Sequence, residues 1–285
     1  MAARRGVLYC ALFAPSSRHG ALMSRRLFSV ILALLLSGCS AASEDTGAPE
    51  PAWVELFDGA TLDRWIVKIT GAETGDDPWG TFRVEDGLLT VGYEQYDSFD
   101  GRFGHLFFEE PFSDYELRVE YRFVGEQVQG GPGWALRNSG VMFHAQSPGS
   151  MLRDQDFPIS LEAQFLGGNG VEDRPTSNLC TPGTHVKMIG ELVEAHCITA
   201  EAPTFHGEQW VTADLIVRGS SSIVHVIDGD TVLAYGFPLI GGGVVDGFDP
   251  SEKEDGRALT SGFIALQSES HPIQFRRVAL RRLSN

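Results

Sequence analysis

The sequence has little basic charge and no long helical pattern after its first 38 residues. It contains 22 lysines and arginines against 38 aspartates and glutamates, and residues 1–38 hold five of the arginines and none of the acids. The chain from Cys39 onward therefore has a net charge of −21. This charge repels phosphate backbones and argues against a nucleic-acid partner. The missing 3.6-residue period argues against an α-helical fold.

The apolar run near the N-terminus is too short to span a membrane comfortably. It extends from Leu27 to Leu36, whereas a span needs roughly 20 apolar residues. Together with the basic segment Met23–Arg26 it predicts a secretory signal over residues 1–38, with Met23 as an alternative start. The run ends in Leu-Ser-Gly-Cys39, which resembles the lipobox of bacterial lipoproteins. The resemblance implies cleavage before Cys39 and lipid on its thiol; the alternative is an ordinary signal followed by a cysteine.

Residues 39–52 are small, acidic and proline-containing, and their composition predicts a flexible tether rather than folded structure. Ser40 follows the lipidated position and resembles the sorting signal that directs lipoproteins to an outer membrane. We therefore expect a location in the bacterial cell envelope, facing the periplasm or the exterior. The lipid anchor is the expected link to the membrane.

Cysteine is scarce, with four residues in the whole chain. Cys10 and Cys39 belong to the leader and the anchor, which leaves Cys180 and Cys197. In an exported protein these two predict a disulfide, which closes a loop of this length with a stabilisation of about 3 kcal/mol. His185 and His196 are zinc-ligand types near the same cysteines, so a zinc site is the alternative.

Strand patterns dominate residues 53–285. The segment Asp114–Phe123 alternates apolar and charged residues without interruption, and Ile159–Phe165 alternates in the same way. Asp228-Gly229-Asp230 separates two β-branched runs and predicts a hairpin turn. Further strands are expected at Val211–Val217, Ile223–Ile227, Phe263–Gln267 and Ile273–Leu280. Many short strands with turn residues between them predict an all-β, antiparallel β-sandwich or jelly roll in a single domain.

Three segments are too long for hairpin connections and are expected to be functional loops or lids: Val124–Arg137, Gly167–Ala195 and Gly241–Arg257. The third is rich in acid, and it either binds calcium or is a solvated loop. It lacks the ligand spacing of an EF-hand, which favours the solvated loop. We predict no cofactor, with a divalent cation such as calcium as the alternative. The acidic residues are Asp246, Asp249, Glu252, Glu254 and Asp255.

A series of short motifs extends from Trp53 to Leu283. They are Trp53–Gly59 with Trp65, Phe82–Leu89, Asp114–Phe123, Asn138–His144, Leu161–Phe165, Gly207–Trp210, Gly262–Glu269 and Pro272–Arg276. Their order and spacing resemble the 3-keto-disaccharide hydrolase family. The resemblance implies a concanavalin A-like sandwich of two antiparallel sheets and action on sugars oxidised to a ketone at C3. The Gly167–Ala195 segment departs from the family pattern, as does His144, where arginine is more usual.

Alternation along the strands selects a set of polar side chains. If the apolar residues of Ile159–Phe165 face the core, Glu162 and Gln164 point away from it, and the same argument turns His144 outward. In a sandwich, the outward face of one sheet either forms a ligand groove or is an ordinary solvated face. The family resemblance favours the groove. Its predicted lining is Glu162, Gln164, His144, Gln267 and Glu269.

The implied reaction suits these residue types. A ketone at C3 acidifies the hydrogen on C2, and a carboxylate can remove it as a general base. Glu162 is the predicted base, and His144 and Glu269 are expected to relay the proton or assist the leaving group. Loss of the C1 substituent followed by addition of water would complete a net hydrolysis. The residues expected to hold substrate oxygens are Arg137, Asn138, Gln164 and Gln267.

Two other functions remain open at the level of sequence. A conventional glycosidase needs two carboxylates about 5–5.5 Å apart for retention, and the same-face neighbour of Glu162 is the amide Gln164. Only Glu269 can restore a pair, if the fold brings it close. A non-catalytic glycan-binding module would instead stack sugars on Trp79, Tyr93, Tyr96 and Trp134. His206, His225 and His271 are expected to be structural or surface residues.

Overall fold

The computed structural model describes residues 51–284, so the predicted signal, Cys39 and nearly all of the predicted tether lie outside the described residues. Within residues 51–284 the secondary structure consists of strands and three short 3-10 helices. No helix in this part of the chain is long and apolar enough to cross a membrane.

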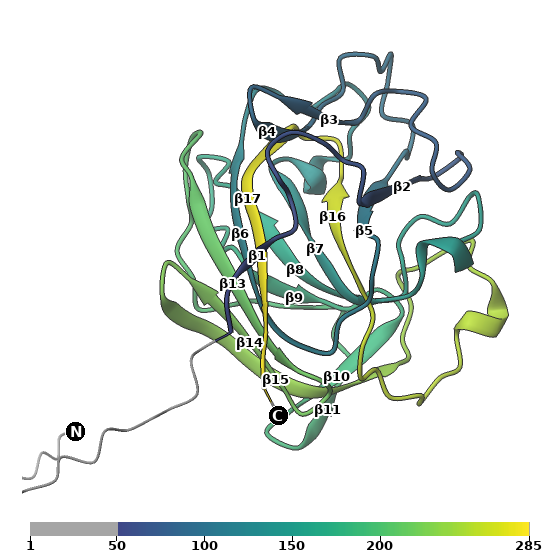
Figure 1. The fold of residues 1–285 in the computed structure, drawn as a ribbon, viewed down its shortest axis with the longest axis vertical. Coiled ribbons are helices and arrows are strands. Elements are labelled where there is room, and N and C mark those ends of the chain that lie inside the picture. Colours follow the sequence, from purple (N-terminus) through teal and green to yellow (C-terminus); the bar gives the residue numbers. More distant parts are fainter. Residues whose placement is uncertain (1–50, 285) are drawn as a thin grey trace, which may run out of the picture. The chain divides into compact units, whose positions relative to one another are not determined.

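The strands form two antiparallel sheets that face each other (Figure 1). The larger sheet has the order β11-β10-β15-β14-β13-β6-β17-β4-β3, and β1 pairs with β17 at its side. Its strands are β1 (Val54–Glu55), β3 (Phe82–Glu85), β4 (Leu88–Val91), β6 (Asp114–Phe123), β10 (Thr184–Met188), β11 (Glu191–Val193), β13 (Val211–Arg218), β14 (Ser222–Ile227), β15 (Asp230–Ile240) and β17 (Ile273–Arg282).

The smaller sheet has seven strands in the order β12-β9-β8-β7-β16-β5-β2. They are β2 (Trp65–Ile69), β5 (Gly104–Phe108), β7 (Asn138–Ala145), β8 (Leu161–Leu166), β9 (Asn178–Cys180), β12 (Cys197–Ile198) and β16 (Phe263–Ser268). The two sheets confirm the predicted all-β, antiparallel sandwich.

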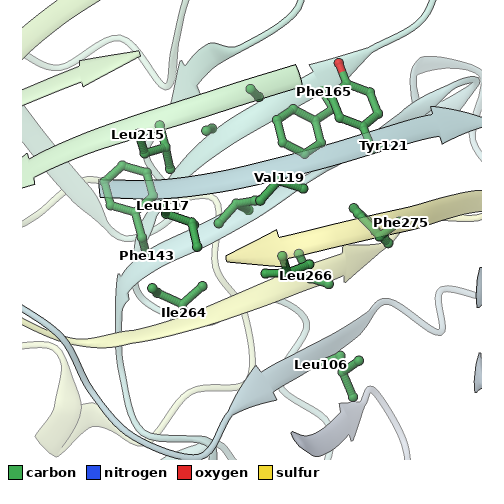
Figure 2. Close-up of a cluster of buried hydrophobic side chains, with 14 of the residues drawn as sticks. Leu106, Leu117, Val119, Tyr121, Phe143, Phe165, Leu215, Ile264, Leu266 and Phe275 are labelled. Carbon is green, nitrogen blue, oxygen red and sulfur yellow. The ribbon is translucent and has the colours of Figure 1, made fainter. Parts of the chain in front are cut away.

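The core fills the space between the sheets (Figure 2). The uninterrupted alternation of β6 places one row of apolar side chains in this core, as the sequence predicts, because successive strand residues point to opposite faces. Tyr121 of β6 stacks on Phe165 of β8, with ring centroids 4.0 Å apart, and so joins the two sheets directly. The buried hydroxyl of Tyr121 is hydrogen-bonded to the Thr176 hydroxyl at 2.6 Å, which satisfies its polar atom.

The Gly167–Ala195 segment, which the sequence predicted to be a functional loop or lid, contains strands. It contains β9, which extends the smaller sheet, and the β10–β11 hairpin, which extends the larger one. These strands have only three to five residues, too few to show a clear alternation. The predicted disulfide is present: Cys180 of β9 is bonded to Cys197 of β12, and the two residues are directly paired across the strands.

Candidate functional site

A cavity of about 380 Å³ opens on the outward face of the smaller sheet. Its floor comes from neighbouring strands, because alternate residues of β7, β8 and β9 point away from the core. The polar floor residues include Glu162 and Gln164, whose outward orientation the alternation of β8 predicted. The floor is formed by Asn138, Glu162, Gln164, Cys180 and Glu269.

The walls of the cavity come from loops. Each of the three long segments contributes: Trp134 lies in the 3-10 helix η1 (Gly133–Ala135), Pro182 follows β9, and Val244 follows β15. Phe157, from the loop before β8, and His196 complete the walls. The side chains around the polar floor are therefore largely apolar, which is typical of small-molecule sites.

Glu162 lies on the cavity floor but is only 5% exposed. Its Oε1 atom has no hydrogen-bond partner among the described residues. Burial penalises the charged carboxylate and raises the pKa of Glu162 to about 8. A carboxyl group with a pKa near neutrality can both accept and release a proton, as a general base must.

Gly140 on β7 makes the room that Glu162 occupies. A Cβ atom at position 140 would lie 2.8 Å from Glu162 Oε1 and 2.9 Å from the main-chain oxygen of Ala163. We expect Gly140→Ala to displace the carboxyl group and to lower kcat by about tenfold or more, since small misplacements of a catalytic group are costly. Steady-state kinetics and a thermal melt would check this. A folded Gly140→Ala variant with wild-type kcat would contradict the assigned role of Glu162.

Glu269 completes a pair of buried carboxyl groups. It is 3% exposed, and its Oε1 accepts a 3.0 Å hydrogen bond from Gln267 Nε2, while Oε2 has no partner among the described residues. Burial and the nearby charge of Glu162 both raise the pKa of Glu269, well above the usual range. Because two like charges oppose each other in a buried site, the pair retains a proton at neutral pH.

His144 does not join these carboxyl groups, so its predicted outward orientation is wrong. The pairing of β7 with β16 shifts by one residue between Met142 and Ala145, and His144 has a φ of +46°. This β-bulge reverses the alternation. The imidazole Nε2 instead lies 2.9 Å from the main-chain oxygen of Gly219. Gly219 belongs to the turn between β13 and β14 of the larger sheet.

Two more predicted residues lie near the cavity without lining it. Gln267 is fully buried and supports Glu269 through the hydrogen bond described above. Arg137 immediately precedes Asn138, is half-buried, and donates from Nη1 to the main-chain oxygen of Gly207 at 2.9 Å. The structure thus brings Asn138, Glu162, Gln164 and Glu269 together on one floor and leaves His144 outside it.

Among the aromatic residues considered for sugar stacking, Trp134 reaches the cavity. It is 55% exposed, and one side of its ring stacks on Phe103 at 6.0 Å. Tyr93 and Tyr96 are buried, contrary to what a stacking platform needs. Tyr93 is a structural anchor, since its hydroxyl accepts a hydrogen bond from the main-chain N–H of Ser270 at 2.8 Å.

The disulfide forms one edge of the cavity floor. Cys180 pairs directly with Glu162 across β8 and β9, so the bond fixes the strand beside the carboxyl group. The ligand atoms of Cys180, Cys197 and His196 lie within 4.8 Å of one another, the one such convergence among the described residues. Thiolate is the form of cysteine that binds metal, and the disulfide removes it.

The acidic loop after β15 has internal partners. Asp249 caps the 3-10 helix η3 (Pro250–Glu252) by accepting from the Ser251 N–H, and Lys253 pairs with Asp255 at 2.6 Å. These contacts lie within the loop itself.

Some cavity residues carried no signal in the sequence. Phe157, Pro182 and Val244 sit in irregular segments, and only their tertiary placement brings them to the cavity. Gly140 was recognisable as part of the Asn138–His144 motif, but the clash it avoids depends on the register between β7 and β8.

The chain matches one family model and is similar to solved structures of low sequence identity. Residues 52–281 match the model of a family described as 3-keto-alpha-glucoside-1,2-lyase-like domain. Similar solved structures include one titled "putative glycosyl hydrolase" from Parabacteroides distasonis, with 16% identity, coverage of 81% of this chain and 100% of that chain, and a TM-score of 0.48. Another is a carbohydrate-binding module from Bacillus subtilis, with 10% identity, coverage of 82% and 97%, and a TM-score of 0.38. No curated protein matches the chain.

Proposed function

Because the chain belongs to the family of 3-keto-alpha-glucoside-1,2-lyase-like domains, and is thereby a carbohydrate-active protein, we propose that it cleaves 3-keto-glycosides by elimination followed by hydration. The observation that carries the proposal is the pair of buried carboxyl groups, Glu162 and Glu269, in one cavity. Elimination across C1 and C2 needs one base and one acid, and a pair that shares a proton supplies both.

The unequal environments of the two carboxyl groups suggest their roles. Burial raises the pKa of both carboxyl groups, and the nearby charge of Glu162 adds to the rise at Glu269, so we assign the shared proton to Glu269. Glu162 then removes the hydrogen from C2, the electrons of that bond form the C1–C2 double bond, and the C1–oxygen bond breaks. Glu269 protonates the departing oxygen. In the second half, water adds to C1 and a proton returns to C2, which gives the free 3-keto sugar.

Amide groups on the floor can hold the ketone oxygen as negative charge develops on it. Gln164 Oε1 accepts a 3.1 Å hydrogen bond from Asn178 Nδ2, which orients the amide and leaves its NH2 group for a ligand. Asn138 is 2% exposed and lines the same cavity, and its Oδ1, which has no partner among the described residues, can accept a hydrogen bond from a sugar hydroxyl. Donors fixed before the reaction stabilise an enolate without reorganisation.

A conventional glycosidase is the second candidate, and the same pair of carboxyl groups favours it. The sequence offered only the amide Gln164 as the same-face partner of Glu162, but the fold supplies Glu269, the residue that follows β16. Direct hydrolysis would then use one carboxyl as acid and the other as nucleophile or base.

Matched substrates separate the two candidates. We expect kcat/KM for a 3-keto-glucoside to exceed that for the same unoxidised glucoside by about 10²-fold or more, since only the ketone makes the C2 hydrogen acidic enough for a carboxylate. Product release measured under identical conditions would check this. Equal turnover of both substrates would support the glycosidase, and binding of both without turnover would support a glycan-binding module.

A further inference from the structure

Two arginines close to the cavity lack an acidic partner. Ten of the fourteen arginines in residues 51–284 lie within 4.0 Å of a carboxylate. Arg137 and Arg174 do not, within the part of the chain that the structure describes. Arg174 is only 9% exposed, and its Nη1 donates to the main-chain oxygen of Gly167 at 2.6 Å. The nearest acid that acts on Arg174 is the exposed Glu172, which lies beyond salt-bridge distance. A buried guanidinium without a carboxylate in direct contact is costly to the fold, which suggests room for an anion.

The two arginines meet at Gly167. A Cβ atom at that position would lie 3.0 Å from the Cβ of Arg137 and 2.9 Å from Phe123. The absence of a side chain at Gly167 therefore lets Arg137 pack directly against its main chain. Burial lowers the pKa of Arg174, the charge of Glu172 opposes this shift, and the like charge of Arg137 adds to it, as expected if the two arginines are neighbours.

His271 belongs to the same cluster. Its ring lies 5.7 Å from that of Phe123, it is 1% exposed, and neither ring nitrogen has a hydrogen-bond partner among the described residues. Burial, then Arg137 and Arg174, lower its pKa to about 4, so the imidazole is neutral at physiological pH and carries one N–H donor. A buried imidazole with both nitrogens unpaired is unusual and points to a ligand.

The cluster lies at the same end of three neighbouring strands as the polar floor of the cavity. Arg137 precedes Asn138 at the start of β7, Gly167 follows the end of β8, and His271 is two residues beyond Glu269, which follows β16. Since β8, β7 and β16 are adjacent and antiparallel, these positions lie on one edge of the site.

We propose that Arg137, Arg174 and His271 form a subsite for an anionic substituent of the glycoside, a carboxylate or a sulfate, and this reading rests on the proposed function. Guanidinium groups pair with planar carboxylates and with sulfates through two parallel hydrogen bonds, and the imidazole N–H adds a third donor. The substrate class is then an acidic 3-keto-glycoside rather than a neutral one. Such a local cluster offsets the repulsion that the strongly acidic domain exerts on an anionic sugar.

Calorimetric binding of methyl glucuronide and methyl glucoside to the protein tests the subsite directly. We expect the wild type to bind the glucuronide about tenfold or more tightly, as charge-assisted hydrogen bonds predict, and to lose this preference as salt rises. Arg174→Gln should remove the preference, whereas Arg218→Gln, at an exposed arginine that also lacks a carboxylate partner, should keep it. Replacement of the buried Arg174 can also disturb folding, so Arg137→Gln, at a less buried arginine, serves as a second variant. Circular dichroism would confirm that both variants fold.

Each outcome bears on the subsite separately from the reaction. Equal affinity for the two sugars, a preference that survives in both arginine variants, or binding of inorganic sulfate without preference for the glucuronide would overturn the subsite. Turnover assays with 3-keto-glucuronide and 3-keto-glucoside then address the reaction. An arginine-dependent preference without turnover of either would leave the subsite standing and remove the proposed function. Turnover of 3-keto-glucoside but not of 3-keto-glucuronide would support the proposed function and overturn the subsite.

Discussion

Replacing Glu162 by glutamine is expected to lower kcat on a 3-keto-glucoside by about 10²-fold or more, the usual contribution of a positioned general base. Glutamine has nearly the same shape as glutamate but cannot accept the C2 proton. Glu191→Gln is the matched control, because Glu191 is an exposed residue of β11, outside the residues that line the cavity. An unchanged kcat in Glu162→Gln would remove this residue from the reaction.

The same substitution should stabilise the protein at alkaline pH, which separates lost chemistry from lost folding. Burial raises the pKa of Glu162, so the folded state holds the proton more tightly than the unfolded state does. Stability therefore falls as pH rises above the unfolded pKa of about 4.3 towards the folded value. Glutamine has no such dependence. We expect Glu162→Gln to melt about 2 °C or more above the wild type at pH 8, and the difference to vanish near pH 4.

Removal of the disulfide should affect both the fold and the site. For the double variant Cys180→Ala with Cys197→Ala, we expect a loss of about 3 kcal/mol in the free energy of unfolding, because the bond no longer restricts the unfolded chain. Urea denaturation would measure this loss. KM should rise as well, since Cys180 lies directly across from Glu162 and both cysteines line the cavity.

Reduced wild-type protein is the natural control for the double variant, and the two should unfold at the same urea concentration. Free thiols in the native protein, or a variant with unchanged stability and KM, would contradict a structural role for the bond. A zinc ion bound in stoichiometric amount to reduced Cys180, Cys197 and His196 would restore the metal interpretation of this edge of the cavity.

The regular strands could be predicted from the sequence because their period is simple. The alternation of Asp114–Phe123 fixed which side chains of β6 enter the core, and that of β8 fixed the outward orientation of Glu162 and Gln164. The alternation predicted the wrong face for His144. One extra residue in β7 relative to β16 changes the face, and the apolar pattern of Val141 to Ala145 does not reveal it.

The rest of the site depends on distances that no local pattern encodes. Glu269 lies 107 positions beyond Glu162 in the chain, and their electrostatic contact follows from the adjacency of β8, β7 and β16. Arg174 offered no motif, and its significance appears only when its missing partner and its burial are both known. Short irregular segments such as the one around Phe157 are placed by tertiary packing alone.

The central claim is removal of the C2 proton, and isotope exchange tests it most directly. A 3-keto-glucoside is cleaved in deuterated water, and the 3-keto sugar product is analysed for deuterium at C2, with product incubated without protein as the control for spontaneous exchange. Elimination and hydration predict one deuterium at C2 in each product molecule, above the control, and loss of this incorporation with Glu162→Gln. Cleavage at the wild-type rate without deuterium at C2 would contradict the account and indicate direct displacement at C1.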